Sequence, residues 1–329
     1  MNRDQKIKWG IIGCGDVCEV KSGPAFNMIE HSSLVAVMRR DAARAKDFAL
    51  RHGVPRWYDK AEAILHDPEI SAVYVATPPA FHEEYTLAAM RAGKHVYVEK
   101  PVAPDVHACE RMITASQKYD VKVSVAHYRR ALPLFTEIRN QLASGVIGRP
   151  LTIRCTTLQA PTDKWREPEY WRATPELSGG GLFFDLAPHQ LDIFYWLFGS
   201  PLQFRGFSSN QRNLYSAADF TTVQALFPDG IYLQGMWAFN VDASCNEDTC
   251  EITGDRGKLV FSFFKPSTLN IITMERTESR TLEFPHHIQH PMINEVVRYF
   301  RGERDNPCSL QDAWVTLRVM ESTRTEKLQ

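Results

Sequence analysis

The chain has 329 residues, of which 44% are hydrophobic and 23% charged, and its formal net charge is −1. This length and composition provide for two domains with ordinary cores, and the balanced charge excludes a basic field that would attract nucleic acid or anionic lipid. The N-terminus lacks the apolar run of a signal peptide, and no stretch approaches a membrane span. Seven scattered cysteines without CxxC spacing indicate free thiols in a reducing, cytoplasmic compartment.

Up to residue 126, short strand-forming runs alternate with helical ones. We expect helices over Asp41–His52, Phe81–Ala92 and Asp105–Tyr119, and strands over Ile7–Ile12, Ser33–Met38, Ala72–Ala76, His95–Val98 and Val121–Ala126. Alternation of this kind, with apolar strands, is typical of an α/β domain with a parallel sheet covered on both faces. The sequence therefore predicts a first domain over residues 1–126.

Strands dominate the rest of the chain. We expect them over Leu151–Leu158, Phe220–Phe227, Ile231–Phe239, Glu251–Thr253 and Lys258–Phe264, with helices over Leu186–Phe198, Pro291–Arg301 and Leu310–Ser322. Turn sequences such as "PDG" and "GDRG" separate neighbouring strands. Residues 127–329 are therefore predicted to form an α+β domain with a mostly antiparallel sheet.

A glycine motif follows the first expected strand, in the stretch "IKWGIIGCGDVCEV". Gly13 allows a tight turn, Gly15 lets a pyrophosphate approach the backbone, and the following helix presents amide groups to the anion. Cys18 replaces the usual third glycine or alanine, and an ordinary glycine-rich turn is the alternative interpretation. Because the motif lies in the first strand–helix unit, we predict dinucleotide binding at Gly13, Gly15, Asp16 and Val17.

Two arginines follow the second expected strand, where an NAD site would place a carboxylate. Arg39 and Arg40 suit a 2′-phosphate, because guanidinium groups pair bidentately with phosphate oxygens. Asp41 accepts from the ribose hydroxyls if the carboxylate position of the motif is shifted along the chain or, more naturally, is the N-cap of the next helix. Solvated arginines at a helix start are the other interpretation. NADP is the predicted cofactor, with NAD as the second choice.

A lysine ends the fourth apolar run of the first domain, in "VYVEKPVAP". Lys100 lies between Glu99 and Pro101, and proline pushes the preceding residue toward extended geometry. The carboxyl ends of strands are where α/β proteins bind ligands. Pro101 is also a candidate for a cis peptide bond.

A second cluster occupies "WRATPELSGGGLFFDLAPHQLD". Asp185, His189 and Asp192 share one helix face, which starts after three glycines that would let a ligand approach the backbone. The alternatives are an N-cap for Asp185, with Pro188 in the first turn, and a satisfied half-buried histidine for His189. We expect a supporting or surface role for Asp192. Trp171 and Arg172 offer an aromatic wall and a cation to a substrate.

Metal binding is the competing interpretation of this cluster. Asp185 and His189 would supply two ligands, but no third or fourth is evident. His286, His287 and His290 in "PHHIQHP" resemble a metal site in composition only. The sequence therefore predicts no metal.

Taken together, these motifs resemble the Gfo/Idh/MocA family of oxidoreductases over nearly the whole chain. The resemblance rests on four stretches, "WGIIGCGDV", "AVYVATPPAFHEEYTLAAMRAGKHVYVEKPVA", "RRALPLFTEIRNQLASGVIGRP" and the cluster at 171–192. It implies a Rossmann domain, an open-faced antiparallel sheet that often mediates oligomers, and NAD(P)-dependent chemistry on hydroxyl or carbonyl groups of sugars, cyclitols or related diols. Ala187 stands where many relatives have glycine. The Trp-Arg pair resembles that of NADP-dependent anhydrofructose reductases.

The resemblance also implies roles for individual residues. Lys100, Asp185 and His189 would be the catalytic residues, with His189 as general acid/base, and the cofactor segments would include Thr77, Pro78, His82, Glu99 and Lys100. Tyr128, Trp171 and Arg172 would contact the substrate together with the catalytic residues, and Arg129 and Trp165 are further wall candidates. The alternatives are a non-catalytic dinucleotide sensor or regulator and an enzyme whose cofactor never dissociates. We expect a homo-oligomer formed through the second sheet.

Overall fold

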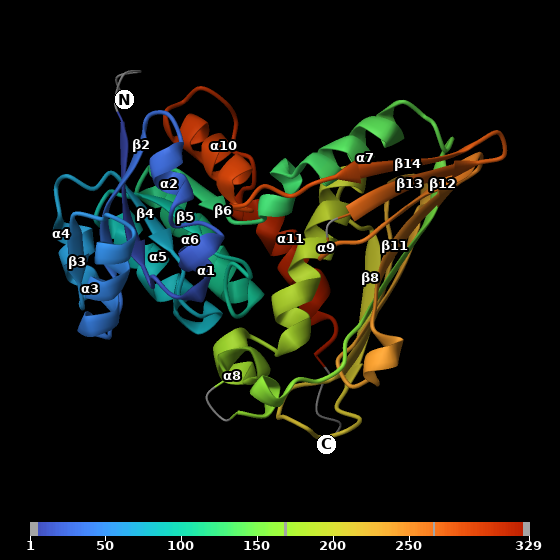
Figure 1. Ribbon diagram of the computed structural model, residues 1–329, viewed down its shortest axis with the longest axis horizontal. Coiled ribbons are helices and arrows are strands. Elements are labelled where there is room, and N and C mark those ends of the chain that lie inside the picture. Colours follow the sequence, from blue (N-terminus) through green and yellow to red (C-terminus); the bar gives the residue numbers. More distant parts are fainter. Residues whose placement is uncertain (1–5, 168–169, 266, 325–329) are drawn as a thin grey trace. The chain divides into compact units, whose positions relative to one another are not determined.

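The chain forms two compact units, which Figure 1 shows as a computed structural model. The structure describes residues 6–167, 170–265 and 267–324. The first unit runs to Ala131 and includes Pro285–Trp314, whereas the second consists of Leu132–Phe284 and the chain from Val315 onward. These units differ from two consecutive domains divided at 126/127, because α10 (His290–Phe300) belongs to the first unit.

The first unit is built on a six-stranded parallel sheet with strand order β3-β2-β1-β4-β5-β6. The chain order therefore reverses between β1 and β4, and parallel sheets bind ligands at the carboxyl ends of strands beside such a reversal. The strands are β1 (Ile7–Ile12), β2 (Ser32–Met38), β3 (Arg56–Tyr58), β4 (Ala72–Val75), β5 (His95–Val98) and β6 (Val123–Val125). The parallel sheet confirms the sequence prediction for this part of the chain.

Helices connect these strands. They are α1 (Asp16–Val20), α2 (Ala25–Met28), α3 (Ala42–Arg51), α4 (Ala61–His66), α5 (His82–Arg91) and α6 (Val106–Lys118), with 3-10 turns at Pro79–Phe81 and Tyr128–Ala131. Asp41 is the N-cap of α3, since its side chain accepts a hydrogen bond from Arg44 N at 3.1 Å. That contact confirms the capping interpretation of Asp41.

The second unit contains an eight-stranded sheet with order β14-β13-β12-β11-β7-β10-β9-β8. Neighbouring strands are antiparallel except β7 and β10, so the prediction of a mostly antiparallel sheet is confirmed. The strands are β7 (Pro150–Leu158), β8 (Gln203–Ser209), β9 (Phe220–Leu226), β10 (Tyr232–Ala238), β11 (Glu247–Gly254), β12 (Gly257–Phe261), β13 (Ser267–Thr273) and β14 (Thr277–Leu282). The helices of this part are α7 (Pro133–Ala143), α8 (Pro175–Ser178), α9 (Leu182–Phe198) and α11 (Leu310–Glu321), and α11 begins in the first unit.

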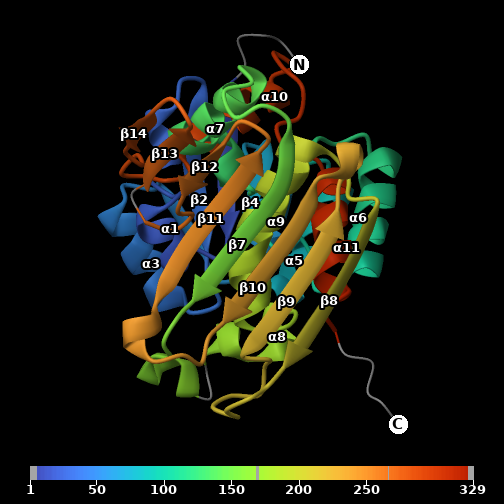
Figure 2. The same ribbon diagram turned by 90° about the vertical axis from the view of Figure 1, so that its right-hand side faces the viewer.

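Helix α9 covers one face of this sheet. Phe183 packs edge-on against Trp237 of β10, with ring centroids 5.1 Å apart. Gln190 joins the same helix to two strands, because it donates to Thr157 Oγ1 at 2.8 Å and accepts from Trp237 Nε1 at 2.7 Å. The opposite face of the sheet is turned toward the viewer in Figure 2.

The start of α9 corrects the sequence prediction. The helix begins at Leu182 with Gly181 as its N-cap, four residues before the predicted start at Leu186. Asp185 is therefore inside the first turn and is not the N-cap, and Pro188 lies beyond the first turn. Leu182 and Phe183 are both buried, and Phe183 packs against Trp237 of β10, so packing extends the helix back toward the glycines.

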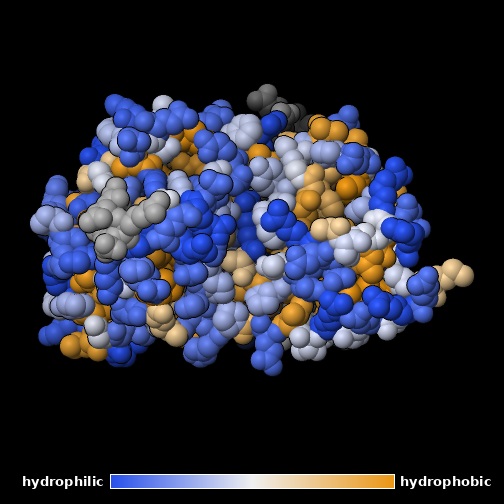
Figure 3. All heavy atoms as spheres, turned by 90° about the horizontal axis from the view of Figure 1, so that it is seen from above, coloured by the Kyte–Doolittle hydropathy of each residue, from blue (hydrophilic) through white to orange (hydrophobic). Residues whose placement is uncertain are grey.

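Hydrophilic and hydrophobic residues are interspersed on the face seen in Figure 3, where the hydrophobic ones form separate patches. Among the residues that the structure describes, no helix combines the length and the apolar character needed to cross a membrane.

Candidate active site

The glycine loop joins β1 to α1 at the carboxyl edge of the parallel sheet. Gly13 has φ +93°, and a Cβ there would lie 2.8 Å from Thr77 Cγ2, so only glycine fits both the turn and the contact. A Cβ at Gly15 would meet nothing closer than Gly13 O at 3.9 Å. The backbone of this loop therefore has open space beside Gly15, and Asp16 and Val17 begin α1 directly after it.

Thr77 offers a polar group beside the same loop. Its Oγ1 is buried and makes no hydrogen bond to the residues described by the structure. A buried hydroxyl without a partner costs free energy unless a ligand supplies one. Together with the open space at Gly15, this hydroxyl fits a dinucleotide whose phosphates lie against the loop.

The cysteines of the loop are not nucleophiles. Burial raises the pKa of Cys14 to about 11, and burial also raises the pKa of Cys18 well above its ordinary value. Both thiols are therefore protonated at neutral pH. Cys18 is fully buried and fills the position where the fingerprint usually has a smaller residue.

The two arginines after β2 lie beside the glycine loop and the turn that precedes α5. Arg39 Nη1 donates to Cys14 O at 3.5 Å, which holds this guanidinium next to the loop. The Arg40 guanidinium carbon lies 5.3 Å from the centre of the Phe81 ring, within cation–π range. The Asp41 side chain caps α3, so the first carboxylate after β2 already accepts a hydrogen bond within the protein.

His82 joins two loops at this edge of the sheet. Its ring is fully buried, with Nδ1 2.8 Å from Pro101 O and Nε2 2.7 Å from Thr77 O. Burial lowers the pKa of His82, and the two carbonyl contacts oppose that change. The ring itself is thus enclosed by protein, and its effect on a ligand would be transmitted by the Thr77–Pro78 and Lys100–Pro101 segments.

Lys100 follows β5, and the peptide bond that joins it to Pro101 is cis, as the sequence indicated. Its backbone N–H donates to Glu99 Oε2 at 3.1 Å. The Glu99 side chain is buried, and its other oxygen accepts from Tyr74 Oη at 2.5 Å and from Gln289 Nε2 at 2.6 Å. Protein donors thus surround Glu99, so the predicted contact between Glu99 and the cofactor would be indirect.

The second cluster lies in the other unit, at the start of α9. Arg172 Nε donates to Asp185 Oδ2 at 3.1 Å, and the Arg172 guanidinium carbon lies 4.4 Å from the Trp171 ring centre. Trp171, Arg172 and Asp185 therefore form one contiguous group. One helical turn further on, His189 is 5% exposed, and its ring lies edge-on to Phe264 with centroids 6.1 Å apart.

The glycines before α9 have a different role from the predicted one. A Cβ at Gly180 would lie 2.3 Å from the Phe184 ring, and a Cβ at Gly181 would lie 2.3 Å from Ala217 Cβ. The space that these glycines leave is thus filled by the protein's own side chains. The expectation that a ligand approaches the backbone at Gly180 and Gly181 is wrong.

Several other predicted site residues are largely buried. Tyr128 and Arg129 are each 4% exposed, and Trp165 packs edge-on against Tyr215 and Phe239. Trp165 is therefore part of an aromatic cluster with Tyr215 and Phe239. Asp192 is 1% exposed, which excludes the surface role considered for it.

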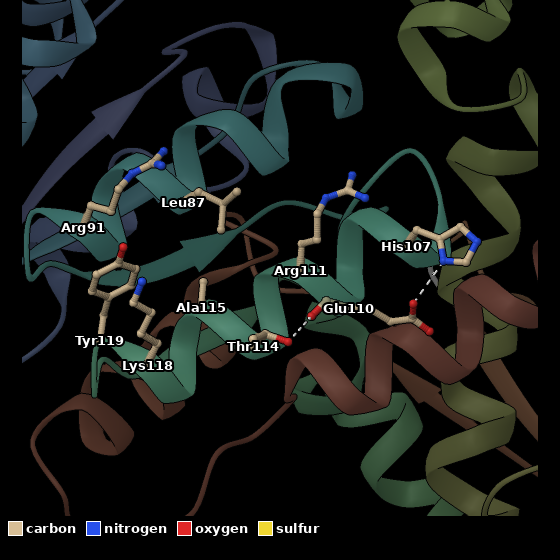
Figure 4. A pocket seen from close by; sticks show the side chains of 9 residues that line it. All are labelled: Leu87, Arg91, His107, Glu110, Arg111, Thr114, Ala115, Lys118 and Tyr119. Atoms are coloured by element: carbon tan, nitrogen blue, oxygen red, sulfur yellow. Dashed lines mark hydrogen bonds and ion pairs between the residues drawn. The ribbon is translucent and has the colours of Figure 1, made fainter.

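A groove of about 580 Å³ lies on the outer side of α5 and α6, and Figure 4 shows its lining. Arg91, Lys118 and Tyr119 lie toward one end, and His107 and Glu110 lie toward the other. None of the predicted site residues lines this groove. Within the described part of the chain, no group of three or more His, Cys, Asp or Glu side chains is arranged to hold a metal ion.

The structure therefore brings the predicted residues together in two groups, one in each unit. The first group lies at the carboxyl edge of the parallel sheet and the second at the start of α9. Sequence reasoning missed Tyr74, Phe81 and Gln289 in the first group and Phe264 in the second. Two of them have little to distinguish them in the sequence, because Tyr74 looks like an ordinary strand residue and Gln289 stands among histidines that resemble a metal site in composition only.

Comparison with known proteins agrees with this geometry. The family described as "Oxidoreductase family, NAD-binding Rossmann fold" matches residues 7–127, and the GFO/IDH/MocA C-terminal domain matches residues 135–260. An oxidoreductase from Formosa agariphila is 42% identical over 97% of this chain and 98% of its own length. A 1,5-anhydro-D-fructose reductase from Ensifer adhaerens is 31% identical over 56% of this chain and 54% of its own.

A solved structure extends the likeness to the fold of both units. The aldose-aldose oxidoreductase from Caulobacter crescentus, complexed with glycerol, matches with a TM-score of 0.86 and 25% identity, covering 97% of this chain and 96% of that one. The glycine loop, the two sheets and the sequence matches lead to one conclusion. The chain belongs to the Gfo/Idh/MocA family and is an oxidoreductase with an NAD(P)-binding Rossmann domain.

Proposed function

We propose that this oxidoreductase interconverts a hydroxyl and a carbonyl group on a sugar, a cyclitol or a related diol, with NADP as its preferred cofactor. The named activities of the similar proteins support the substrate class, since they include a 1,5-anhydro-D-fructose reductase and an aldose-aldose oxidoreductase. The preference for NADP tilts the reaction toward reduction.

The observation that carries the proposal is the position of Lys100. It follows β5, which pairs with β4, and β4 pairs with β1, so the lysine and the glycine loop share the carboxyl edge of one sheet. The Glu99 carboxylate holds the Lys100 amide at 3.1 Å. An ammonium group carried by this fixed backbone would stabilise negative charge that develops on a reacting oxygen.

The chemistry requires a proton to move together with a hydride. A bound nicotinamide supplies or accepts the hydride at the carbinol carbon. In reduction, His189 would give a proton to the carbonyl oxygen while the Lys100 ammonium donates a hydrogen bond to the same atom. In oxidation, His189 would take the hydroxyl proton. Histidine suits this task because its ordinary pKa of about 6.5 makes both forms available near neutral pH.

Asp185 has a supporting role in this proposal. Its carboxylate would accept a hydrogen bond from a neighbouring substrate hydroxyl or orient His189, which lies one helical turn away. The 3.1 Å contact with Arg172 favours the ionised carboxylate, which is the form that accepts such a bond. Trp171 and Tyr128 would contribute apolar surface for a sugar ring.

A cofactor titration tests the NADP assignment. We expect the dialysed protein to bind NADPH more tightly than NADH by fluorescence, and we expect Arg39→Asp to lose that preference, because a carboxylate repels the 2′-phosphate. Arg91→Asp, a change of the same charge in the groove outside the site, serves as the control. Equal or tighter NADH binding by the wild type would overturn the assignment to NADP.

The dialysed protein also distinguishes the two alternative functions, an enzyme whose cofactor does not dissociate and a non-catalytic sensor or regulator. NADP that remains bound after dialysis would indicate an enzyme that recycles its hydride within one turnover. Tight dinucleotide binding without turnover on any sugar, cyclitol or diol would indicate a sensor or regulator. The lysine, the histidine and the carboxylate of the proposed mechanism are all present, which argues against a sensor, since a sensor has no need of all three.

The compartment and the assembly state belong to the same proposal. All seven cysteines, each within the described residues, are free thiols, which supports a reducing, cytoplasmic compartment. Phe207 of β8 is 56% exposed and Tyr232 of β10 is 41% exposed. The strand register places both on the outer face of the eight-stranded sheet, and we propose that this face pairs with a second copy of the chain.

A further inference from the structure

The chain returns to the first unit at Pro285 and reaches α10 through a segment that contains three histidines and one glutamine. The side chain of interest in this segment is the glutamine. Gln289 is fully buried, whereas the neighbouring His286 is exposed. The backbone of Gln289 donates to Lys21 O at 3.0 Å, and His287 Nδ1 lies 2.5 Å from Val20 O. The segment is thus fastened to the end of α1, the helix that follows the glycine loop.

The side chain of Gln289 completes a buried hydrogen-bond network around Glu99. Gln289 Nε2 donates to Glu99 Oε1 at 2.6 Å, and Tyr74 Oη donates to the same oxygen at 2.5 Å. Tyr97 Oη donates to Gln289 Oε1 at 3.2 Å. On the far side of the carboxylate, Lys100 N donates to Glu99 Oε2 at 3.1 Å.

This network has one consistent orientation. A carboxylate oxygen only accepts hydrogen bonds, so the NH₂ group of Gln289 must point at Glu99, and the amide oxygen is left to accept from Tyr97 Oη. Glu99 is 6% exposed and Tyr74, Tyr97 and Gln289 are fully buried, so water cannot readily replace a missing donor. Loss of one donor in such a network affects every other member.

We propose that Gln289 is a positioning residue for Lys100. By holding the Glu99 carboxylate from the side opposite the lysine amide, it fixes the backbone from which the Lys100 side chain extends. The importance of that position rests on the role given to Lys100 in the proposed function. Gln289, which lies 190 residues after Glu99 in the sequence, thereby holds the backbone of Lys100 in place.

Gln289→Met tests the proposal, because methionine has similar volume but neither donates nor accepts a strong hydrogen bond. Amide hydrogen exchange by NMR is the first measurement and needs no substrate. We expect faster exchange at the Lys100 amide, with the amides of β1 and β4 unchanged. His286→Gln alters an exposed side chain of the same segment and is expected to leave this exchange unchanged.

Steady-state kinetics with NADPH and 1,5-anhydro-D-fructose, or the best substrate of a sugar and cyclitol panel, is the second measurement. A misplaced reacting group costs about 10- to 100-fold in kcat, so we expect Gln289→Met to lose this much while KM for NADPH changes little. A role limited to stability would lower the melting temperature and leave kcat of the folded protein at the wild-type value.

Lys100→Met separates this proposal from the proposed function. It removes the side-chain amine but keeps the backbone N–H that donates to Glu99. We expect Lys100→Met to lose turnover, whereas the backbone amide of residue 100 should exchange at the wild-type rate. Wild-type turnover in Lys100→Met would overturn the role of the lysine. Wild-type exchange at the Lys100 amide in Gln289→Met would overturn the positioning role of Gln289, even if no substrate is found.

Gln289→Glu gives a pH signature that simple loss of stability does not. It places a second carboxyl group against Glu99. When the pair holds one proton, the protonated group donates a hydrogen bond to the ionised one, so the lost donor is restored; when both groups are ionised, no donor is present. Burial raises the pKa of Tyr74, Tyr97 and Cys18 and lowers the pKa of His82, so these neighbours stay neutral near pH 7. Lys100 and the histidines beside Gln289, His287 and His290, are present in both proteins.

The ratio of kcat for Gln289→Glu to kcat for the wild type should therefore rise as the pH falls from about 8 to about 6. Division by the wild-type kcat at each pH removes the pH dependence that the two proteins share. A ratio that is constant across this range would contradict the arrangement of Gln289 and Glu99 described above.

Discussion

Lys100 and His189 reach their places by different physical means. The lysine is held by its backbone, through the Glu99 carboxylate and the strand that precedes it. The histidine is held by its helix, where it is 5% exposed and lies edge-on to Phe264. In the proposed mechanism, the fixed backbone would place the charge of the lysine before the reaction begins, and the histidine would exchange the proton.

We expect His189→Asn and Lys100→Met each to lower kcat by about 100-fold or more, because one removes the proton donor and the other removes charge stabilisation. Dissociation constants for NADPH should change little in both variants. Stopped-flow measurement of NADPH oxidation, with fluorescence titration of the cofactor, checks both expectations. His107→Asn, which changes an exposed histidine in the groove of Figure 4, should retain wild-type turnover. Comparable turnover in His189→Asn and the wild type would contradict the acid/base assignment.

Individual residues show where sequence reasoning reaches its limit. The residue types at Gly13 and Asp41 predicted a tight turn and a helix cap, and both are observed, because each depends on its local neighbours. The pair of Arg172 with Asp185 and the network of Gln289 with Glu99 depend on contacts between segments far apart in the chain. Nothing in the local pattern of "PHHIQHP" distinguishes a buried glutamine from an exposed one.

At the scale of elements, long apolar runs were predictable and short or polar ones were not. Strands β1 and β5 have the predicted bounds, because Ile7–Ile12 and His95–Val98 are flanked by clear turn signals. Strands β13 and β14 were missed, since their polar residues lack a strong alternation and their pairing is set by neighbouring strands. The start of α9 was misplaced because Asp185 is a good cap residue, whereas packing placed the cap at Gly181.

Gly181 offers a test of how tightly the start of α9 is packed. Alanine there would adopt φ +89° and place Cβ 2.3 Å from Ala217 Cβ. The backbone strain alone costs roughly 1–3 kcal/mol, and the displacement of Ala217 adds to it. We therefore expect Gly181→Ala to lower the free energy of unfolding, measured in urea, by more than this strain.

Gly199→Ala is the matched control for that measurement. Gly199 has φ +83° and ψ −170°, close to the φ +89° and ψ −159° of Gly181, and the nearest atom to a Cβ there would be Pro228 Cγ at 3.9 Å. The backbone strain is therefore similar in the two variants, and the difference in stability reports the contact with Ala217. If Gly181→Ala and Gly199→Ala lose equal stability, the start of α9 is more loosely packed than the structure indicates.

At the scale of the whole molecule, the outer face of the eight-stranded sheet is the surface proposed for assembly. Phe207→Asp adds a charge to this face, so we expect light scattering after size-exclusion chromatography to show a shift from oligomer to monomer. Leu50, which is 73% exposed on α3, provides the control, since Leu50→Asp adds the same charge outside the sheet. A wild-type mass equal to that of one chain would contradict the proposed assembly.

The return of residues 285–314 to the first unit has a consequence for inheritance and recombination. The chain changes unit after residues 131, 284 and 314, so the cofactor-binding unit is encoded by two separate stretches of the gene. A single crossover after residue 131 would pair the lysine motif of one parent with the Gln289 segment of the other. Functional chimeras within the family should therefore exchange both stretches together, and Glu99 and Gln289 should be inherited as a pair.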